Sequence, residues 1–485
     1  MNIPHLMFVV RGNIMHRLKK TVDMTEGPFF KKMIMFAIPL VISGVLQSLY
    51  NAADMIIVGL YRGDVAVAAV GSTGSITNLT VGLFMGLSVG AGVSVAHHIG
   101  AKEYGEVKKV VHTSVLLSAI LGVIIGAIGF FISGTLLSMM DTPAEVLPYS
   151  TLYMQIIFLG VPASMIYNYS AAMIRSAGDS KRPMIFLAIS GLVNVMLNVI
   201  FITVFGMGVE GVAIATIISQ YLSAAMPLVY LVKTSGPLRM SFNEMKINAA
   251  KVKKILYIGI PSGIQTSLFS LSNVVIQSSI NGFGDTVMAG SAASANVEAL
   301  VYVAMNSIYH VALTFIGQNV GAKKYKNIRR LTVYSSLIVT TVGLGCALIL
   351  LLVKYPLLNL YVSSPAAMDA ALMRFYIIMP TYFLCGLMDV FCGGLRALDR
   401  SVTAMIISLG GACGLRLLWI ATVFKAYPSP MTIYLSYPVT WAITAGLQLT
   451  FMIFAAKKII RNDRAAQKFL DQQKQEIGEK VNELT

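Results

Sequence analysis

Long apolar segments separated by short polar turns make up most of this sequence. A helix of about 20 apolar residues spans the hydrocarbon core of a bilayer, and the chain contains twelve apolar runs of at least this length. They lie near residues 34–58, 70–98, 110–132, 148–174, 183–205, 209–232, 254–280, 289–316, 331–354, 374–396, 402–424 and 431–456. The pattern predicts an all-α membrane protein with twelve transmembrane helices.

The second half of the chain repeats the first. Residues Ile99 to Tyr104 match Val320 to Tyr325 at an offset of 221 positions, and Gly63-Asp64 matches Gly284-Asp285 at the same offset. Six spans are an even number, so both halves enter the membrane from the same side and the repeat is parallel. We therefore expect two six-helix lobes, as in transporters that open alternately to either side of the membrane.

A basic connector separates the two halves. We expect an N-lobe at residues 34–232, a cytoplasmic linker at 233–253 and a C-lobe at 254–456. Residues 1–33 and 457–485 are expected to be cytoplasmic tails.

Composition and charge orient this bundle. Of the 485 residues, 56% are hydrophobic and only 12% are charged, which excludes a soluble protein. All but five of the 37 Lys and Arg fall in the tails and in every second loop, which predicts cytoplasmic termini and a plasma-membrane location. The net charge of +16 thus faces membrane lipid head groups, and no basic soluble face is left for a nucleic acid.

Polar side chains from three helices of the first half reach one level of the predicted bundle. Asp54 lies in the first span, Asn194 and Asn198 share a face of the fifth, and Thr216 lies in the sixth. An ionised carboxylate within a bilayer costs about 2.5–3.5 kcal/mol, so Asp54 points to function. The oxygen-rich group suits Na⁺, or a carboxyl that exchanges a proton; alternatively, the Asn and Thr side chains only join helices.

The second half carries its own ionisable residues. Glu298 and Arg416 share a depth, and we expect them to pair, because pairing lowers the cost of burying both charges. Asp389, at the repeat position of Asn168, either binds a cationic substrate or a proton, or pairs with a structural neighbour. The candidates for a substrate cleft are Gln47, Tyr50, Asn51, Asn168, Gln265, Glu298, Asp389 and Arg416.

No motif indicates an enzyme. The chain has neither an HExxH helix nor a P-loop, and its longest loop, 233–253, is too short for a catalytic domain. The cysteines lack metal-ligand spacing and are expected to be reduced core residues; they are Cys346, Cys385, Cys392 and Cys413. We expect no cofactor, only Na⁺ or H⁺ as a coupling ion.

In combination these features resemble the multidrug and toxic compound extrusion (MATE) family. The resemblance rests on Pro39 to Gly59 with its buried Asp54, the two Gly-Ala-Lys turns, the turn from Arg175 to Pro183 and the twelve-span duplication. It implies two lobes meeting in a V-shaped cleft. It also implies an antiporter that expels organic, often cationic, small molecules in exchange for Na⁺ or H⁺, and we expect a monomer.

The resemblance also implies a coupling site. In the branch with archaeal and gut-bacterial members, the residues assigned to cation coupling match Asp54, Asn194, Asn198 and Thr216 here. Many of those relatives carry Asp where this chain has Asn198, so the loss of one negative charge leaves Na⁺ and H⁺ both open. The alternative function is a flippase for lipid-linked precursors from the same superfamily; its cleft should carry several basic residues, whereas only Arg416 lies well within a predicted span.

Overall fold

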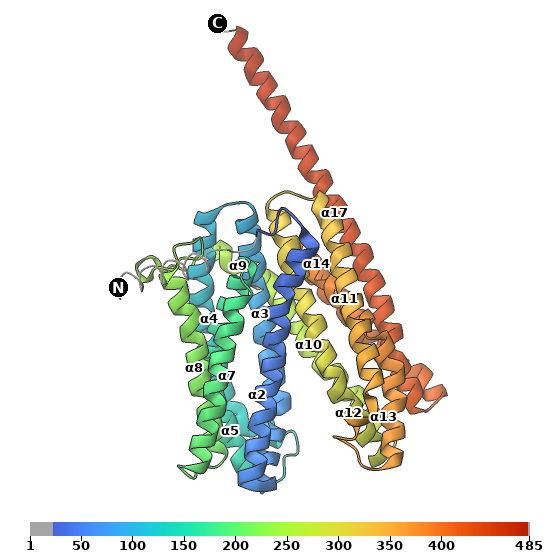
Figure 1. The fold of residues 1–485 in the computed structure, drawn as a ribbon. Coiled ribbons are helices and arrows are strands. Elements are labelled where there is room, and N and C mark those ends of the chain that lie inside the picture. Colours follow the sequence, from blue (N-terminus) through green and yellow to red (C-terminus); the bar gives the residue numbers. More distant parts are fainter. Residues whose placement is uncertain (1–22, 484–485) are drawn as a thin grey trace, which may run out of the picture.

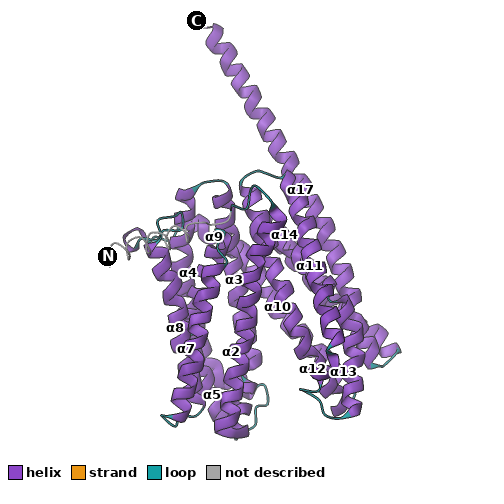
Figure 2. Cartoon of the chain, in the orientation of Figure 1, coloured by secondary structure: helices purple, strands orange, loops and turns teal. Residues whose placement is uncertain are grey.

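The computed structural model describes residues 23–483, which form helices and no strand (Figures 1 and 2). Of the predicted N-terminal tail, residues 1–22 lie outside the described part. The α-helices are α2 (Phe29–Ser72), α3 (Gly74–Gly100), α4 (Tyr104–Ser138), α5 (Leu147–Leu159), α6 (Val161–Ser176), α7 (Lys181–Thr203), α8 (Val209–Lys233), α9 (Ala249–Asn281), α10 (Asp285–Gly321), α11 (Lys326–Leu352), α12 (Lys354–Leu358), α13 (Pro365–Ile378), α14 (Phe383–Ala397), α15 (Ser401–Ser408), α16 (Leu415–Trp419) and α17 (Pro430–Glu483). Two π-helical segments, Leu409–Gly414 and Ile420–Phe424, flank α16.

The helices coincide with the predicted spans. In the described part of the chain, nine single helices are long and apolar enough to cross a membrane, and the number is eleven when two bent pairs each count as one span. The remaining predicted span lies within α9, where Ser, Thr and Gln side chains lower the hydropathy. The chain is thus a multi-pass membrane protein.

Matching breaks occur in the two halves. Helices α5 and α6 meet at 46° next to Pro162, and α13 and α14 meet at 44° next to Pro380; proline removes a helical hydrogen bond and bends the chain. The turns after the first and seventh spans use Gly63 (φ +72°) and Gly284 (φ +88°), a left-handed backbone that favours glycine.

The helices form two lobes that meet at one end and diverge toward the other, giving a V (Figure 1). Helices α4, α5, α7 and α8 lie on one side of the molecule, and α11, α12, α13 and α17 lie on the other. We call the end that carries turns 101–103, 177–180, 234–248, 322–325 and 398–400 the basic end. The lobes meet at the basic end.

Helix α2 contacts both lobes. Its first half packs against α10, with Phe36 edge-on to Phe315 at a ring-centroid distance of 5.9 Å. Its second half lies in an apolar cluster with α5, α7 and α8, in which Val58 is fully buried. Helix α9 makes the corresponding crossing, since Ile255 lies in the apolar core of the opposite lobe. The opening helix of each half thus links the two lobes.

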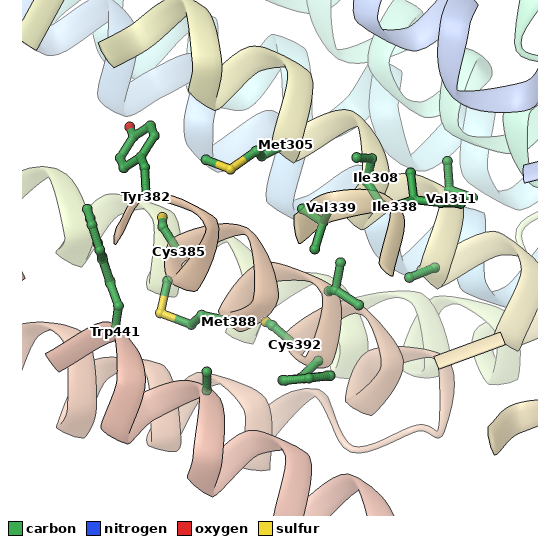
Figure 3. Close-up of a cluster of buried hydrophobic side chains, with 14 of the residues drawn as sticks. Met305, Ile308, Val311, Ile338, Val339, Tyr382, Cys385, Met388, Cys392 and Trp441 are labelled. Atoms are coloured by element: carbon green, nitrogen blue, oxygen red, sulfur yellow. The ribbon is translucent and has the colours of Figure 1, made fainter. Parts of the chain in front are cut away.

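The largest apolar core lies in the second half. It joins α10, α11, α14 and α17 around Met305, Val339, Cys385 and Met388, with Tyr382 and Trp441 at one edge (Figure 3). All four cysteines are free; Cys385, Cys392 and Cys413 are buried, whereas Cys346 is only partly buried.

Candidate functional site

Tyr50 attaches the outer half of α2 to α7. Its hydroxyl donates a hydrogen bond to the Ala188 carbonyl oxygen at 3.1 Å. Its ring occupies the place where a side chain at position 191 would stand, because a Cβ on Gly191 would lie 1.8 Å from the ring. The Tyr50–Gly191 contact therefore sets the position of Asp54, which follows one helical turn later.

Asp54 meets Asn198 at the contact between α2 and α7. The Asn198 amide nitrogen donates to Asp54 Oδ1, and Asn198 is fully buried with its own Oδ1 unpaired. One turn earlier on α7, Asn194 Nδ2 donates to Thr216 Oγ1 on α8 at 3.4 Å. The structure thus brings the four predicted residues together as two hydrogen-bonded pairs on successive turns.

The charge of Asp54 has no basic counterpart. Among the described residues, no Lys or Arg nitrogen forms an ion pair with it. Arg62, two turns further along α2, donates instead to the Ile202 carbonyl oxygen at 3.0 Å. A half-buried carboxylate beside an unpaired amide oxygen suits a hard cation or a proton.

Tyr153 on α5 is a further residue of this site, which sequence reasoning missed. It is buried in the same apolar cluster as Val58 and Met55, which lie on the part of α2 that carries Asp54. Nothing in the spacing of α5 singles Tyr153 out, because its proximity to Asp54 depends on how α5 packs against α2.

The cleft candidates on the first lobe differ in their surroundings. Gln47 and Asn51 are exposed on α2, and their side chains approach each other at 3.5 Å. Asn168 donates to the Ser164 carbonyl oxygen of its own helix at 2.8 Å. Gln47 and Asn51 remain available to a substrate, whereas Tyr50 is occupied with α7.

Gln265 and Asp389 lie near Arg396 in the second lobe. Gln265 is buried and accepts a hydrogen bond from Arg396 at 2.9 Å. Arg396 also donates to the Tyr309 hydroxyl. Asp389, two turns before Arg396 on α14, is 9% exposed and has an unpaired Oδ2. The side-chain oxygen of Gln265 is therefore occupied by the Arg396 guanidinium, whereas Oδ2 of Asp389 has no hydrogen-bond donor.

The predicted pairing of Glu298 with Arg416 is wrong. Arg374 on α13 takes both carboxylate oxygens of Glu298, at 2.8 Å through Nε and 2.7 Å through Nη2. Arg374 lies in the first part of the bent pair α13–α14 and is only 6% exposed, whereas the apolar pattern placed it at the outer end of the predicted span 374–396. The sequence placed Glu298 and Arg416 at the same depth in the membrane, but it did not show in which direction around its helix axis each side chain points.

Arg416 is left without an acidic partner among the described residues. It is 5% exposed, donates to Thr440 Oγ1 at 3.4 Å, and lies over the Tyr437 ring at 4.1 Å. Burying a charge at mid-bilayer costs about 2.5–3.5 kcal/mol, and a desolvated cation–π contact contributes about 2 kcal/mol. These contacts offset only part of the cost.

Two hydrogen bonds related by the internal repeat close the basic end. His97 Nε2 bonds to the Ala397 carbonyl oxygen at 2.7 Å, and Gln318 Nε2 bonds to the Ser176 carbonyl oxygen at 2.8 Å. Both bonds join opposite lobes. They are accompanied by close backbone contact, since a Cβ on Gly100 would lie 1.9 Å from the Gln318 oxygen. The sequence singled out neither bond as functional.

Comparison with known proteins places this architecture in a family. The model of the MatE family matches residues 39–200 and 261–421. The chain is 27% identical over 448 residues to probable multidrug resistance protein YoeA of Bacillus subtilis, covering 90% of this chain and 96% of YoeA. It is also 27% identical to probable multidrug resistance protein NorM of Thermotoga maritima, covering 78% of this chain and 82% of NorM.

A solved structure shares the fold. An outward-facing multidrug resistance MATE family transporter of the MOP superfamily superposes with a TM-score of 0.85 at 20% identity, covering 91% of this chain and 99% of the other. The family match covers both halves of the repeat, including the helices that carry Asp54, Asn194 and Asn198. The chain is therefore a transporter, not an enzyme, and it belongs to the MatE (MATE) family.

Proposed function

We propose that this protein is a multidrug efflux antiporter that expels small organic, often cationic, compounds in exchange for Na⁺ or H⁺. The observation that carries the proposal is the Asp54 carboxylate, which has no basic partner among the described residues and accepts a hydrogen bond from the buried Asn198. The names of relatives such as YoeA and NorM support export of drugs.

The basic end faces the cytoplasm of a plasma membrane in this proposal. The tails and basic turns gather there, as the positive-inside rule requires. The lobes are joined at that end by His97 and Gln318 and diverge at the other end (Figure 1). This arrangement corresponds to a transporter open to the outside.

Helix α2 connects cation binding to the movement of the lobes. A cation or proton on Asp54 changes the charge at the contact between α2 and α7, and the first half of the same helix packs against α10. Antiport requires that substrate and coupling ion favour different conformations, because a ligand shifts an equilibrium only by its differential affinity. A helix that contacts both lobes is suited to transmit this difference.

Efflux from proteoliposomes tests the proposal. A fluorescent organic cation is followed under a Na⁺ gradient alone and then a pH gradient alone, with native protein, Asp54→Asn and the control Asp141→Asn. Asp141 is exposed in a turn with φ +55°, a backbone that Asn also adopts. We expect one gradient to drive transport, Asp54→Asn to abolish it and the control to retain it.

Two results would count against the proposal. If neither gradient moves the cation, the substrate class is wrong, and the flippase function becomes the better hypothesis. If Asp54→Asn transports as well as the control, coupling does not depend on Asp54.

A further inference from the structure

The contact between α7 and α8 that holds part of the coupling site has a counterpart in the second lobe. At the repeat offset of 221, Thr216 on α8 corresponds to Tyr437 on α17, and Val195, next to Asn194, corresponds to Arg416 on α16. In the first lobe the contact joins an amide to a hydroxyl. In the second lobe it joins a guanidinium to a ring. The second-lobe contact therefore carries a positive charge where the first-lobe contact is neutral.

The surroundings of Arg416 supply no counter-charge. Its one hydrogen-bond partner in the described chain is the Thr440 hydroxyl, at the long distance of 3.4 Å, and its Nε has none. The carboxylate of Glu298 is occupied by Arg374 through two hydrogen bonds. Arg374 itself approaches the same Tyr437 ring at 5.5 Å, so two cations share this ring.

Aromatic rings extend from this cation in a row. The Tyr437 and Trp441 ring centroids lie 5.5 Å apart, and those of Trp441 and Tyr382 lie 5.3 Å apart. Tyr382 and Trp441 line one edge of the cluster drawn in Figure 3. A molecule with a flat ring and one negative group could thus place its charge on Arg416 and its ring against Tyr437, the half-buried end of this row, while Trp441 and Tyr382, 5% and 8% exposed, lie deeper.

The backbone around Arg416 is also unusual. Helix α16 is one short α-helical turn between the π-helical segments Leu409–Gly414 and Ile420–Phe424. Such segments are rare and occur frequently at functional sites. The corresponding helix of the first lobe, α7, is continuous from Lys181 to Thr203. The π-helical segments thus occur in the lobe that has the buried arginine and are absent from the equivalent helix α7.

We propose that Arg416 is the charged contact of an anion-binding site in the C-lobe. The site takes one singly charged anionic group, either the carboxylate of a small aromatic molecule or a free halide. The guanidinium donates hydrogen bonds to the anion, and a carboxylate ligand adds ring contacts to Tyr437 and Trp441. Binding at this site does not depend on the drug-for-cation exchange proposed above.

Fluorescence of Trp441 reports on the site in the purified full chain. The sequence contains two tryptophans, so a Trp419→Phe background leaves Trp441 alone, within reach of Tyr437. The probe is 4-nitrobenzoate, whose nitroaromatic ring quenches tryptophan, and 4-nitrobenzyl alcohol is its neutral counterpart. We expect saturable quenching by the anion, and binding of the alcohol weaker by about tenfold or more, because a hydrogen bond to a charged group is lost.

Variants of Arg416 decide whether the charge is responsible. Arg416→Gln should weaken 4-nitrobenzoate binding by about tenfold or more, Arg416→Lys should weaken it less, and the exposed control Arg400→Gln should leave it unchanged. Arg416→Gln removes a buried charge that has no acidic partner, so it should fold. If it does not fold, the comparison of anion with alcohol in the native chain and in Arg416→Lys decides instead.

Competition distinguishes the two sources of the anion. If sodium chloride displaces 4-nitrobenzoate where sodium gluconate does not, the site takes a free halide; if neither does, it takes the aromatic carboxylate. Equal binding of 4-nitrobenzoate and the alcohol overturns the proposal. So does a folded Arg416→Gln variant that keeps native affinity.

Discussion

The ion pair between Glu298 and Arg374 provides a sharp test of how the second lobe is held together. Both side chains are nearly inaccessible, at 4% and 6% exposure, and two hydrogen bonds of 2.8 and 2.7 Å join them. Removing one partner of a buried pair leaves the other charge uncompensated, which costs about 3–5 kcal/mol. We therefore expect Glu298→Gln and Arg374→Met each to destabilise the protein by about this amount.

The double variant should be less damaging than the sum of the single variants. Replacing both members of a buried pair removes both desolvated charges and is often close to neutral. Residues in direct contact commonly couple by about 0.5–3 kcal/mol, whereas independent sites add within about 0.5 kcal/mol. The coupling between Glu298 and Arg374 should thus exceed 0.5 kcal/mol clearly.

Reversible unfolding in mixed detergent, followed by tryptophan fluorescence, gives the four free energies needed for each double-mutant cycle. The matched control cycle combines Glu298→Gln with Arg416→Met, since the two arginines are similarly buried. We expect Arg416→Met and Glu298→Gln to couple much less strongly than Glu298 and Arg374, because Arg416 is linked to this pair only through the Tyr437 ring. Additive effects of Glu298 and Arg374, or strong coupling of Glu298 to Arg416, would refute the pairing described above.

Four further substitutions test the coupling site and the contact between the lobes. If Na⁺ is the coupling ion, Asn198→Asp should tighten its binding by about tenfold or more in calorimetric titrations, because a unit charge about 4 Å away contributes about 4 kcal/mol at an effective dielectric constant of 20. Unchanged Na⁺ affinity would contradict a Na⁺ site at Asp54 and Asn198. Gly90→Leu should separate α3 from α9, because even a Cβ would lie 2.0 Å from the Ile255 oxygen. The buried Cys392 should then react faster with a maleimide than in the native protein. An unchanged labelling rate would contradict this packing. Tyr50→Phe should lower the unfolding free energy by about 1 kcal/mol, because its hydrogen bond is lost. Gly191→Leu should also reduce Asp54-dependent transport, because its side chain would clash with the Tyr50 ring. Unaffected transport in Gly191→Leu would show that Tyr50 does not position Asp54.

The sequence by itself determined the architecture and the depth of the polar residues. Bilayer thickness imposes the length of each span, so apolar runs revealed the helices and the repeat revealed the two lobes. Depth follows from the fixed rise of a helix, and it grouped Asp54, Asn194, Asn198 and Thr216 before any contact was known. The structure indeed places Asp54 beside Asn198 and Asn194 beside Thr216.

Only the tertiary structure decided which side chains at one depth meet. Helix rise gives a level but not a direction, so Glu298 was expected to pair with Arg416, although the bent pair α13–α14 brings Arg374 to it. Asp369 and Arg374 also lower the hydropathy of α13, so the apolar pattern did not show that this helix is the first part of the span. The packing of Tyr153 against the part of α2 that carries Asp54 and the crossing of α2 between lobes likewise depend on tertiary contacts, which no spacing along a single helix encodes.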